Sequence, residues 1–244
     1  MLISFFEEFP TKRNLNKIKL INFKTKLYIA AKSYKEFNKV ISKIKNKNIL
    51  EFIYWPILSI KEGYWISPFA DRKALLRIFN EQIDHSIMID AEIPIHKNLN
   101  QIINFYKNKI LINKFIKNHN VYTAEYYPKG FLKEKIFSFL GLNFDPKKYN
   151  NKVIKMFYHS MHDFKERFIR KHLKYYSNKY KNKFLIAYGV IAKGIGGNEP
   201  ILSLKQLDKD LSLAKEYNIK EVVIFRLGGL NKKYLNIIKK YVQI

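Results

Sequence analysis

The segment Ile87-Met88-Ile89-Asp90-Ala91-Glu92-Ile93-Pro94 decides how the fold of this sequence is interpreted. Its apolar residues predict a buried strand, which ends at the proline because proline has no N–H to donate to a neighbouring strand. Alternate side chains of a strand share a face, so Asp90 and Glu92 are expected side by side at its end. Burying a carboxylate in an apolar strand costs free energy, unless a positive group pairs with it or the charge serves a function. The segment therefore predicts either a strand-end ion pair with a lysine or arginine, or a catalytic site.

Seven other segments have the same apolar character and also predict strands. They are nearly continuous runs of Ile, Val, Phe and Leu, which is typical of a parallel sheet covered on both faces. The predicted strands are Leu2–Phe6, Lys26–Ala31, Ile49–Pro56, Val121–Tyr127, Lys152–His159, Phe184–Val190 and Glu221–Leu227.

Helical periodicity follows each of these strands. Five of the predicted helices begin with a capping residue, in chain order Thr11, Ser33, Asp71, Ser203 and Asn231. The other three are predicted over Lys97–Asn118, over Phe131–Leu140 and from Asp163 to about Tyr180. Eight strand–helix pairs in 244 residues predict one α/β domain, a single (β/α)8 TIM barrel over residues 1–244. An open doubly wound sheet is the alternative, but no glycine-rich turn follows the first strand.

Composition excludes several classes of protein. The chain has no cysteine, so disulfides, thiolate nucleophiles and zinc-thiolate sites are excluded. No apolar run approaches the roughly 20 residues that span a bilayer. The start, Met1–Glu8, lacks the basic flank of a signal peptide. We therefore expect a cytoplasmic protein without a membrane partner. The sequence does not indicate an oligomeric state.

The formal net charge of +26 raises the question of an anionic partner. Only six of the 46 basic residues are arginine, and the lysines are spread along the whole chain. A dedicated nucleic-acid surface would cluster its charge and use the planar fork of arginine. The abundance of lysine, isoleucine and asparagine is typical of an A/T-rich genome. We therefore expect no specific nucleic-acid partner.

The carboxyl ends of barrel strands hold the catalytic groups of TIM-barrel enzymes. The predicted strand ends bring carboxylates and aromatic rings to that rim, with further aromatic residues in the loop after the third strand. The predicted catalytic residues are Glu92, Asp90 and Glu125, and the predicted substrate-binding residues are Trp55, Tyr64, Trp65, Tyr126, Tyr158, His159 and Arg226.

These residue types favour carbohydrate chemistry. Glycoside hydrolysis uses two carboxyl groups, one of which protonates the leaving oxygen. Burial and a neighbouring carboxylate both raise the pKa of a carboxyl group, so the pair Asp90 and Glu92 is expected to keep one proton near neutral pH. Aromatic rings stack on the apolar faces of sugars. Ordinary core packing is the alternative for these rings, and Trp65 lies in a loop too short to bury it fully.

Two short motifs resemble known glycoside hydrolases. Asp90-Ala91-Glu92 resembles the Asp-x-Glu of family-18 chitinases and of the lysozyme-like family-25 barrels, and Met156-Phe157-Tyr158 resembles the Met-x-Tyr of the chitinases. The resemblance implies a glycosidase in which Glu92 is the general acid and Asp90 orients the acetamido group of the substrate. The chain departs from the chitinase pattern in lacking the earlier aspartates of the motif and in placing His159, not aspartate, after Tyr158.

A phosphate site is the main competing prediction. TIM barrels often bind phosphate in the loops after strands seven and eight. Here those loops hold Lys193, Gly196, Gly197, Gly228 and Gly229, close to Arg226. They would suit a sugar phosphate or a phosphodiester, unless the glycines only make turns.

Two more alternatives concern metal ions and catalysis itself. A metal site from Asp90, Glu92, Glu125 and His159 lacks the histidine spacing of hydrolytic metal barrels, so we expect neither a metal nor a cofactor. A non-catalytic barrel that binds sugar or protein remains open, because the fold does not determine the function.

Overall fold

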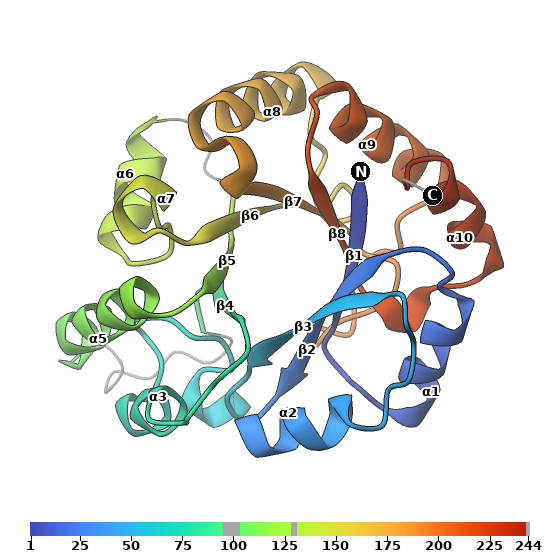
Figure 1. Cartoon of the computed structure of the whole chain (residues 1–244). Coiled ribbons are helices and arrows are strands. Elements are labelled where there is room, and N and C mark those ends of the chain that lie inside the picture. The colour runs from blue at the N-terminus through green and yellow to red at the C-terminus, as the bar shows by residue number, and fades with distance from the viewer. Residues whose placement is uncertain (95–102, 128–130, 243–244) are drawn as a thin grey trace. The chain divides into compact units, whose positions relative to one another are not determined.

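The chain folds as a closed barrel of parallel strands, which confirms the predicted (β/α)8 architecture. The computed structural model describes residues 1–94, 103–127 and 131–242. In that part, eight strands follow one another around the barrel in chain order (Figure 1). They are β1 (Leu2–Glu7), β2 (Thr25–Ala31), β3 (Ile49–Pro56), β4 (Ile87–Ala91), β5 (Val121–Glu125), β6 (Lys152–Phe157), β7 (Phe184–Gly189) and β8 (Glu221–Phe225).

Helices and short 3₁₀ turns connect the strands. They are α1 (Lys12–Leu15), η1 (Asn16–Leu20), α2 (Tyr34–Ile41), η2 (Ile60–Glu62), α3 (Arg72–Phe79), α5 (Phe105–Asn118), α6 (Phe131–Phe139), α7 (Pro146–Tyr149), α8 (Glu166–Tyr180), η3 (Lys181–Lys183), α9 (Leu204–Glu216), η4 (Leu227–Gly229) and α10 (Lys232–Lys239). No helix within the described ranges is both long and apolar enough to cross a membrane.

The predicted helix starts are confirmed where a polar side chain caps the helix. The side chains of Thr11, Asp71, Ser203 and Asn231 each accept a backbone N–H from the first turn, and Ser33 accepts one from Glu36. The prediction for Asp163 is wrong, because α8 begins three residues later after Lys165. Residues 97–102 of another predicted helix lie outside the described residues.

Contacts divide the chain into two compact units. The first comprises residues 1–29, 42–52 and 154–244. In it β1 pairs with β2 and β8, and β8 pairs with β7. A polar network lies between the amino ends of these strands, where Glu221 accepts hydrogen bonds from Ser4 (2.7 Å) and Tyr28 (2.9 Å) and pairs with Lys26 (3.3 Å). The buried charge of Glu221 is therefore compensated.

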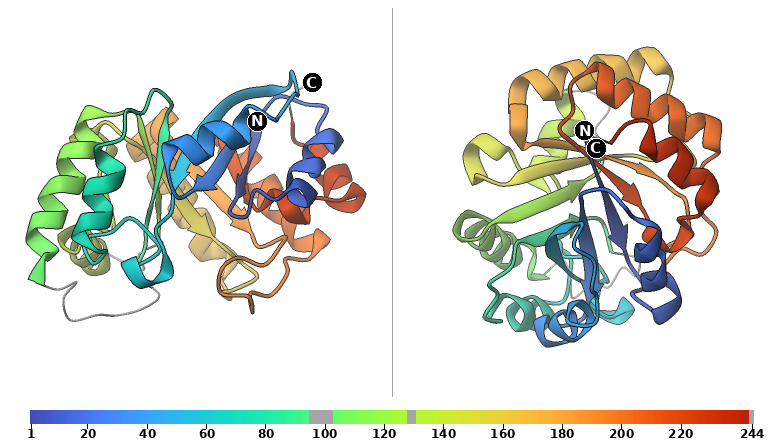
Figure 2. Two further views of the ribbon diagram at one scale, coloured as in Figure 1. Left: turned by 90° about the horizontal axis from the view of Figure 1, so that it is seen from below. Right: turned by 45° about the vertical axis from the view of Figure 1, so that its right-hand side comes forward.

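The second unit comprises residues 30–41 and 53–153. Its core lies between β4 and the helices α3 and α5, which run side by side (Figure 2). Ile87, Ile89 and Ala91 of β4 belong to this core, together with Leu75 of α3 and Ile112 of α5. Complete burial of such side chains contributes about 1.5–3 kcal/mol each for the larger ones. Since alternate residues of a strand point to opposite faces, Asp90 must point away from these helices, towards the barrel interior.

Candidate functional site

Asp90, Glu92 and Tyr126 form a polar cluster at the carboxyl ends of β4 and β5. The two strands pair in parallel, with Asp90 opposite Ala124 and Ala91 opposite Glu125. This register brings the two residues that follow the strands, Glu92 and Tyr126, next to each other. The Tyr126 hydroxyl donates a hydrogen bond to Glu92 Oε2 at 2.8 Å. Asp90 is 6% exposed, whereas Glu92 and Tyr126 are half-buried. The cluster is thus reachable from solvent through Glu92.

The electrostatics of the cluster keep Tyr126 protonated. Burial raises the pKa of Tyr126 well above its ordinary value, and the negative charges of Glu92 and Asp90 raise it further. The phenol is therefore a permanent hydrogen-bond donor to Glu92. A donated hydrogen bond orients the carboxylate and favours its ionised form.

The loop between β3 and α3 lies next to this cluster. A Cβ on Gly63 would meet Ala70 Cα at 3.2 Å and Pro94 Cγ at 3.6 Å, so the loop packs against the segment that follows Glu92. Trp65 lies in this loop and is partly exposed, while Tyr64 is 4% exposed. Trp55 at the end of β3 is 2% exposed. Of these three rings, Trp65 is therefore the one that solvent partly reaches, and the other two pack mainly in the core.

An ion pair holds this loop to α3. Both oxygens of Glu62 accept hydrogen bonds from Arg77, at 2.8 and 3.2 Å. Ser59 donates to the same carboxylate through its backbone N–H and its hydroxyl. The hydrogen bonds from Arg77 are the main reason why the pKa of Glu62 is lowered to about 2.

This ion pair predicts a pH-dependent contribution to stability. A carboxyl group with a lowered pKa stabilises the folded state above its unfolded pKa of about 4.5, and that contribution is lost as the pH falls towards 2. We expect Arg77→Gln to lower the free energy of unfolding by about 0.5–1 kcal/mol at neutral pH, because the pair is exposed and screened. The difference from the parent protein should shrink as the pH falls through that window, as measured by urea unfolding. A difference that does not change with pH would contradict this account.

Glu125 is the last residue of β5, and its side chain points to the face of the strand opposite to the Glu92 cluster. It is completely buried. Its Oε1 accepts hydrogen bonds from the Phe144 N–H at 2.9 Å and from Thr123 Oγ1 at 2.7 Å. Asn151 in turn donates to Thr123 at 2.7 Å. The structure does not bring Glu125 together with Glu92, because alternation along β5 puts it among the groups that anchor the segment after α6.

Tyr158 and His159 follow β6 in the first unit and have different surroundings. The Tyr158 ring is half-buried and lies 5.8 Å from the ring of Phe225. His159 Nδ1 lies 2.9 Å from Asp210 Oδ1 on α9, and Gln206 donates to the same carboxylate at 2.7 Å. Burial raises the pKa of Asp210, and the interaction with His159 opposes that shift. His159 therefore ties the loop after β6 to α9.

The side chain of Arg226 binds other groups of the chain itself. Its Nη1 lies 2.8 Å from Glu7 Oε1, its Nε donates to the Lys193 carbonyl at 2.9 Å, and its guanidinium lies 4.7 Å from the centre of the Phe9 ring. Glu7 is completely buried. The Gly228 N–H donates to the other oxygen of Glu7 at 2.6 Å. A carboxylate of the chain itself thus holds the arginine and the amide that the phosphate prediction assigned to a ligand.

The glycines of the two loops serve close packing and turns. A Cβ on Gly229 would lie 1.8 Å from the Ile191 carbonyl oxygen. The Gly196 N–H donates to Glu199 at 3.0 Å, and Gly197 has φ +74°, a left-handed conformation. The geometry favours the turn interpretation over the phosphate one.

The Arg226 network gives a second prediction. We expect Arg226→Lys to lower the free energy of unfolding by about 1.5–3 kcal/mol, because an ammonium group cannot reach both Glu7 and the Lys193 carbonyl. Inorganic phosphate should leave the melting temperature of both proteins unchanged. Arg13→Lys, at an exposed position, is the control and should change stability by less than about 0.5 kcal/mol. A phosphate-dependent rise in melting temperature that Arg226→Lys removes would support the phosphate site instead.

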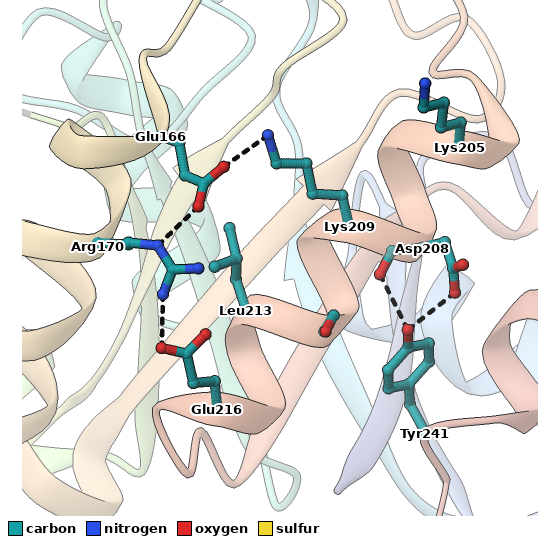
Figure 3. Close-up of a pocket in the computed structure, with 9 residues that line it drawn as sticks. Glu166, Arg170, Lys205, Asp208, Lys209, Leu213, Glu216 and Tyr241 are labelled. Atoms are coloured by element: carbon teal, nitrogen blue, oxygen red, sulfur yellow. Dashed lines mark hydrogen bonds and ion pairs between the residues drawn. The ribbon is translucent and has the colours of Figure 1, made fainter.

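A pocket on the outside of the first unit lies between α8 and α9 (Figure 3). It has a volume of about 330 Å³. Arg170 bridges Glu166 and Glu216 across it, and Lys209 pairs with Glu166 at 2.8 Å. These four charged side chains thus bind one another and link the two helices. It contains none of the predicted site residues.

Among the described residues, no group of three or more His, Asp and Glu side chains could hold a metal ion.

The sequence interpretation missed Asp210, the partner of His159. The signal was present, because Asp210 follows Leu207 by three residues and precedes Leu211, so it lies on the buried face of α9.

Comparisons with known proteins show the fold. No protein-family model matches the chain, and no curated protein sequence matches it. The glycoside hydrolase domain of PgaB (BpsB) from Bordetella bronchiseptica is 9% identical, with a TM-score of 0.64 over 100% of this chain and 98% of that one. The spore cortex-lytic enzyme SleL from Bacillus cereus is 12% identical, with a TM-score of 0.62 over 100% of this chain and 74% of that one. A chitinase from Chromobacterium violaceum is 10% identical, with a TM-score of 0.54 over 98% of both chains.

These structures fit the resemblance to the chitinase-like barrels that the motifs indicate. The same fold also occurs in an HMG-CoA lyase from Acinetobacter baumannii, which is 7% identical and has a TM-score of 0.54 over 100% of this chain and 86% of that one. At these identities the comparisons establish a (β/α)8 barrel, and the reaction has to be argued from the residues of the site.

Proposed function

We propose that the chain is a carbohydrate-active barrel that hydrolyses a glycosidic bond, with Glu92 as the general acid. The observation that carries this proposal is the hydrogen bond from Tyr126 to Glu92 at the barrel end of β4, beside the buried Asp90. Glu92 is partly exposed and is oriented by a fixed donor. The hydrogen bond from Tyr126 favours its ionised form, and the neighbouring negative charge of Asp90 opposes this by favouring the protonated form that a general acid needs.

In the proposed reaction Glu92 gives its proton to the glycosidic oxygen as the bond from that oxygen to the sugar carbon breaks. Water then adds to the sugar carbon and gives up a proton, which returns to the Glu92 carboxylate. Asp90 is the proposed helper, and the resemblance to family-18 chitinases implies that it orients an acetamido group. Trp65 is the proposed sugar platform, since its ring is partly exposed in a loop that packs against the segment after Glu92. Glu125 and His159 are left out, because other residues of the chain hold their polar groups. Tyr158 remains a prediction from the Met-x-Tyr resemblance.

Tyr126→Phe tests the role of the cluster. The substitution removes the hydrogen bond to Glu92, so a general acid at this position would remain protonated at higher pH. We expect the alkaline limb of the pH–rate profile to move to higher pH and turnover at its optimum to fall by about tenfold. The measurement is hydrolysis of a panel of neutral oligosaccharides across pH. Tyr149→Phe, on α7 and outside the cluster, should leave the profile unchanged.

The same panel separates this proposal from a non-catalytic barrel. If neutral oligosaccharides raise the melting temperature of the parent protein but none is cleaved, the chain binds sugar without turnover. An unchanged pH–rate profile in Tyr126→Phe would show that hydrolysis takes place without this cluster.

A further inference from the structure

The helices α5 and α6 of the second unit are neighbours (Figure 1), and exposed apolar side chains gather on them. In the described part of the chain, twelve large apolar side chains are exposed, and half of them lie on or beside these helices. They are Ile103 (77% exposed), Tyr106 (64%), Ile110 (66%), Leu132 (71%), Ile136 (46%) and Phe139 (56%). A concentration of this kind marks an interaction surface, whereas single exposed apolar residues need no explanation.

The apolar residues form a stripe on each helix. On α5, Tyr106 and Ile110 have helical spacing and share one face, and Ile103 lies just before the helix begins. Ile112 and Phe115 on the opposite face of α5 are buried in the core of the unit. On α6, the spacing of four and three residues puts Leu132, Ile136 and Phe139 on one face. Core packing thus accounts for the inner face of α5 but not for the outer stripes.

Contacts join the two helices. The ring of Phe105 on α5 lies 6.3 Å from the ring of Phe139 on α6. Lys109 Nζ lies 4.8 Å from the centre of the Phe139 ring and donates a hydrogen bond to the Phe139 carbonyl. We call the six exposed side chains and the lysines beside them the α5–α6 surface.

Lysines border both stripes. With 3.6 residues per turn, Lys107 and Lys114 lie on one side of the α5 stripe and Lys109 on the other, and Lys133 and Lys135 lie on the two sides of the α6 stripe. α5 contains no acidic residue and neither helix contains arginine. The surface is therefore apolar along its middle and positively charged along its edges.

We propose that the α5–α6 surface binds the surface of an anionic lipid membrane. Long lysine stems lie along apolar surface and extend their charges to the headgroups, while side chains such as Ile136 enter the boundary with the acyl chains. Each lysine near an anionic leaflet strengthens binding by about fivefold. The net charge of +26 acts in the same direction.

Other occupants fit the α5–α6 surface less well. A second copy of this chain would bring two strongly positive molecules together, and like charges repel. Protein interfaces are depleted in lysine and enriched in arginine, which is the opposite of the composition here. Nucleic acid would neutralise the lysines but offers no apolar surface for the stripes. The absence of a bilayer-spanning segment led to the expectation of no membrane partner, but peripheral binding needs only a surface of this kind.

Sedimentation with lipid vesicles tests the proposal. The parent protein should sediment with phosphatidylcholine vesicles that contain about one-third phosphatidylglycerol, bind much less to pure phosphatidylcholine, and dissociate at about 0.5 M salt. The double variant Ile110→Gln with Ile136→Gln keeps the charge but removes two apolar anchors, and should bind at least about tenfold more weakly. Leu50→Gln with Ile201→Gln, two exposed apolar side chains elsewhere, is the matched control and should bind like the parent.

Two double lysine variants test whether the position of the charge matters for vesicle binding. Lys133→Gln with Lys135→Gln should weaken binding to the anionic vesicles by about tenfold or more. Lys232→Gln with Lys233→Gln, on α10, removes the same charge from another surface and should have little effect. Equal losses from the two lysine pairs would show that only diffuse charge is at work and would overturn the proposal. So would vesicle binding that is indifferent to Ile110 and Ile136, or a dimer in size-exclusion chromatography that their substitution converts to a monomer.

Discussion

Glu92→Gln is expected to reduce hydrolysis of a neutral oligosaccharide by about 10²–10⁴-fold, the usual contribution of a positioned general acid. The amide has the shape of the carboxyl group but cannot give a proton to the leaving oxygen. Tyr126 can still donate its hydrogen bond to the amide oxygen, so the melting temperature and the affinity for the sugar should change little. The measurement compares turnover, ligand-induced melting shifts and thermal stability of the parent and the variant.

Glu125→Gln is the matched control for this prediction. Both glutamates follow apolar stretches and were predicted together, but Glu125 holds the Phe144 N–H in the core. Its substitution should lower the free energy of unfolding by about 1–2 kcal/mol and leave the turnover of the folded protein nearly unchanged. If Glu92→Gln retained full activity while Glu125→Gln lost it, the assignment of the general acid would be wrong.

Gly229→Ala is expected to have the largest effect on stability. The new Cβ would lie 1.8 Å from the Ile191 carbonyl oxygen and 2.4 Å from its carbon. The Ile191 backbone is itself held, since its N–H donates to the Phe225 carbonyl at 2.7 Å. The overlap therefore cannot be relieved by turning a side chain. We expect the free energy of unfolding to fall by about 3 kcal/mol or more, as measured by urea unfolding.

Gly197→Ala is the control for a glycine in an open place. No atom lies within 4 Å of a Cβ built at this position, and only its φ of +74° opposes a side chain. A cost of about 1–2 kcal/mol is therefore expected. Equal stability losses in the two variants would show that the loop after β7 moves to make room for the Cβ. The close approach of the Ile191 carbonyl would then not explain the glycine at position 229.

Much of the fold was predictable because burial on both faces leaves a strong signal. Each predicted strand overlaps an observed one, and β3 has the predicted bounds. Strand ends were less predictable: β5, β6 and β8 end two residues before the prediction, since apolar side chains such as Leu227 continue the pattern after the ladder stops. Helix starts were predictable at capping residues such as Asp71 and Ser203.

The candidate site was predictable in part. The two-residue period of β4 places Asp90 and Glu92 on one face, and the structure adds that Ile89 and its neighbours occupy the other. Glu125 and Arg226 also lie at strand ends, but the choice of face there depends on partners distant in sequence. Glu7, which pairs with Arg226, is 219 residues away. Local patterns cannot reveal such a partner.

Exposure was the least predictable property. Among the aromatic residues, Trp55 and Tyr64 are buried while Trp65 is partly exposed, a difference that depends on how one loop packs. The apolar stripes of α5 and α6 read as ordinary core positions in the sequence. Their exposure is visible only once α5 has turned its other face towards β4.

A crystal structure of the Glu92→Gln protein with a bound neutral oligosaccharide would show where the scissile bond lies relative to position 92. We expect a glycosidic oxygen within about 3 Å of the side chain at position 92, which is hydrogen-bond reach of the proton donor, and a sugar ring stacked on Trp65. An oligosaccharide bound away from β4, with no glycosidic oxygen near position 92, would contradict the proposed role of Glu92.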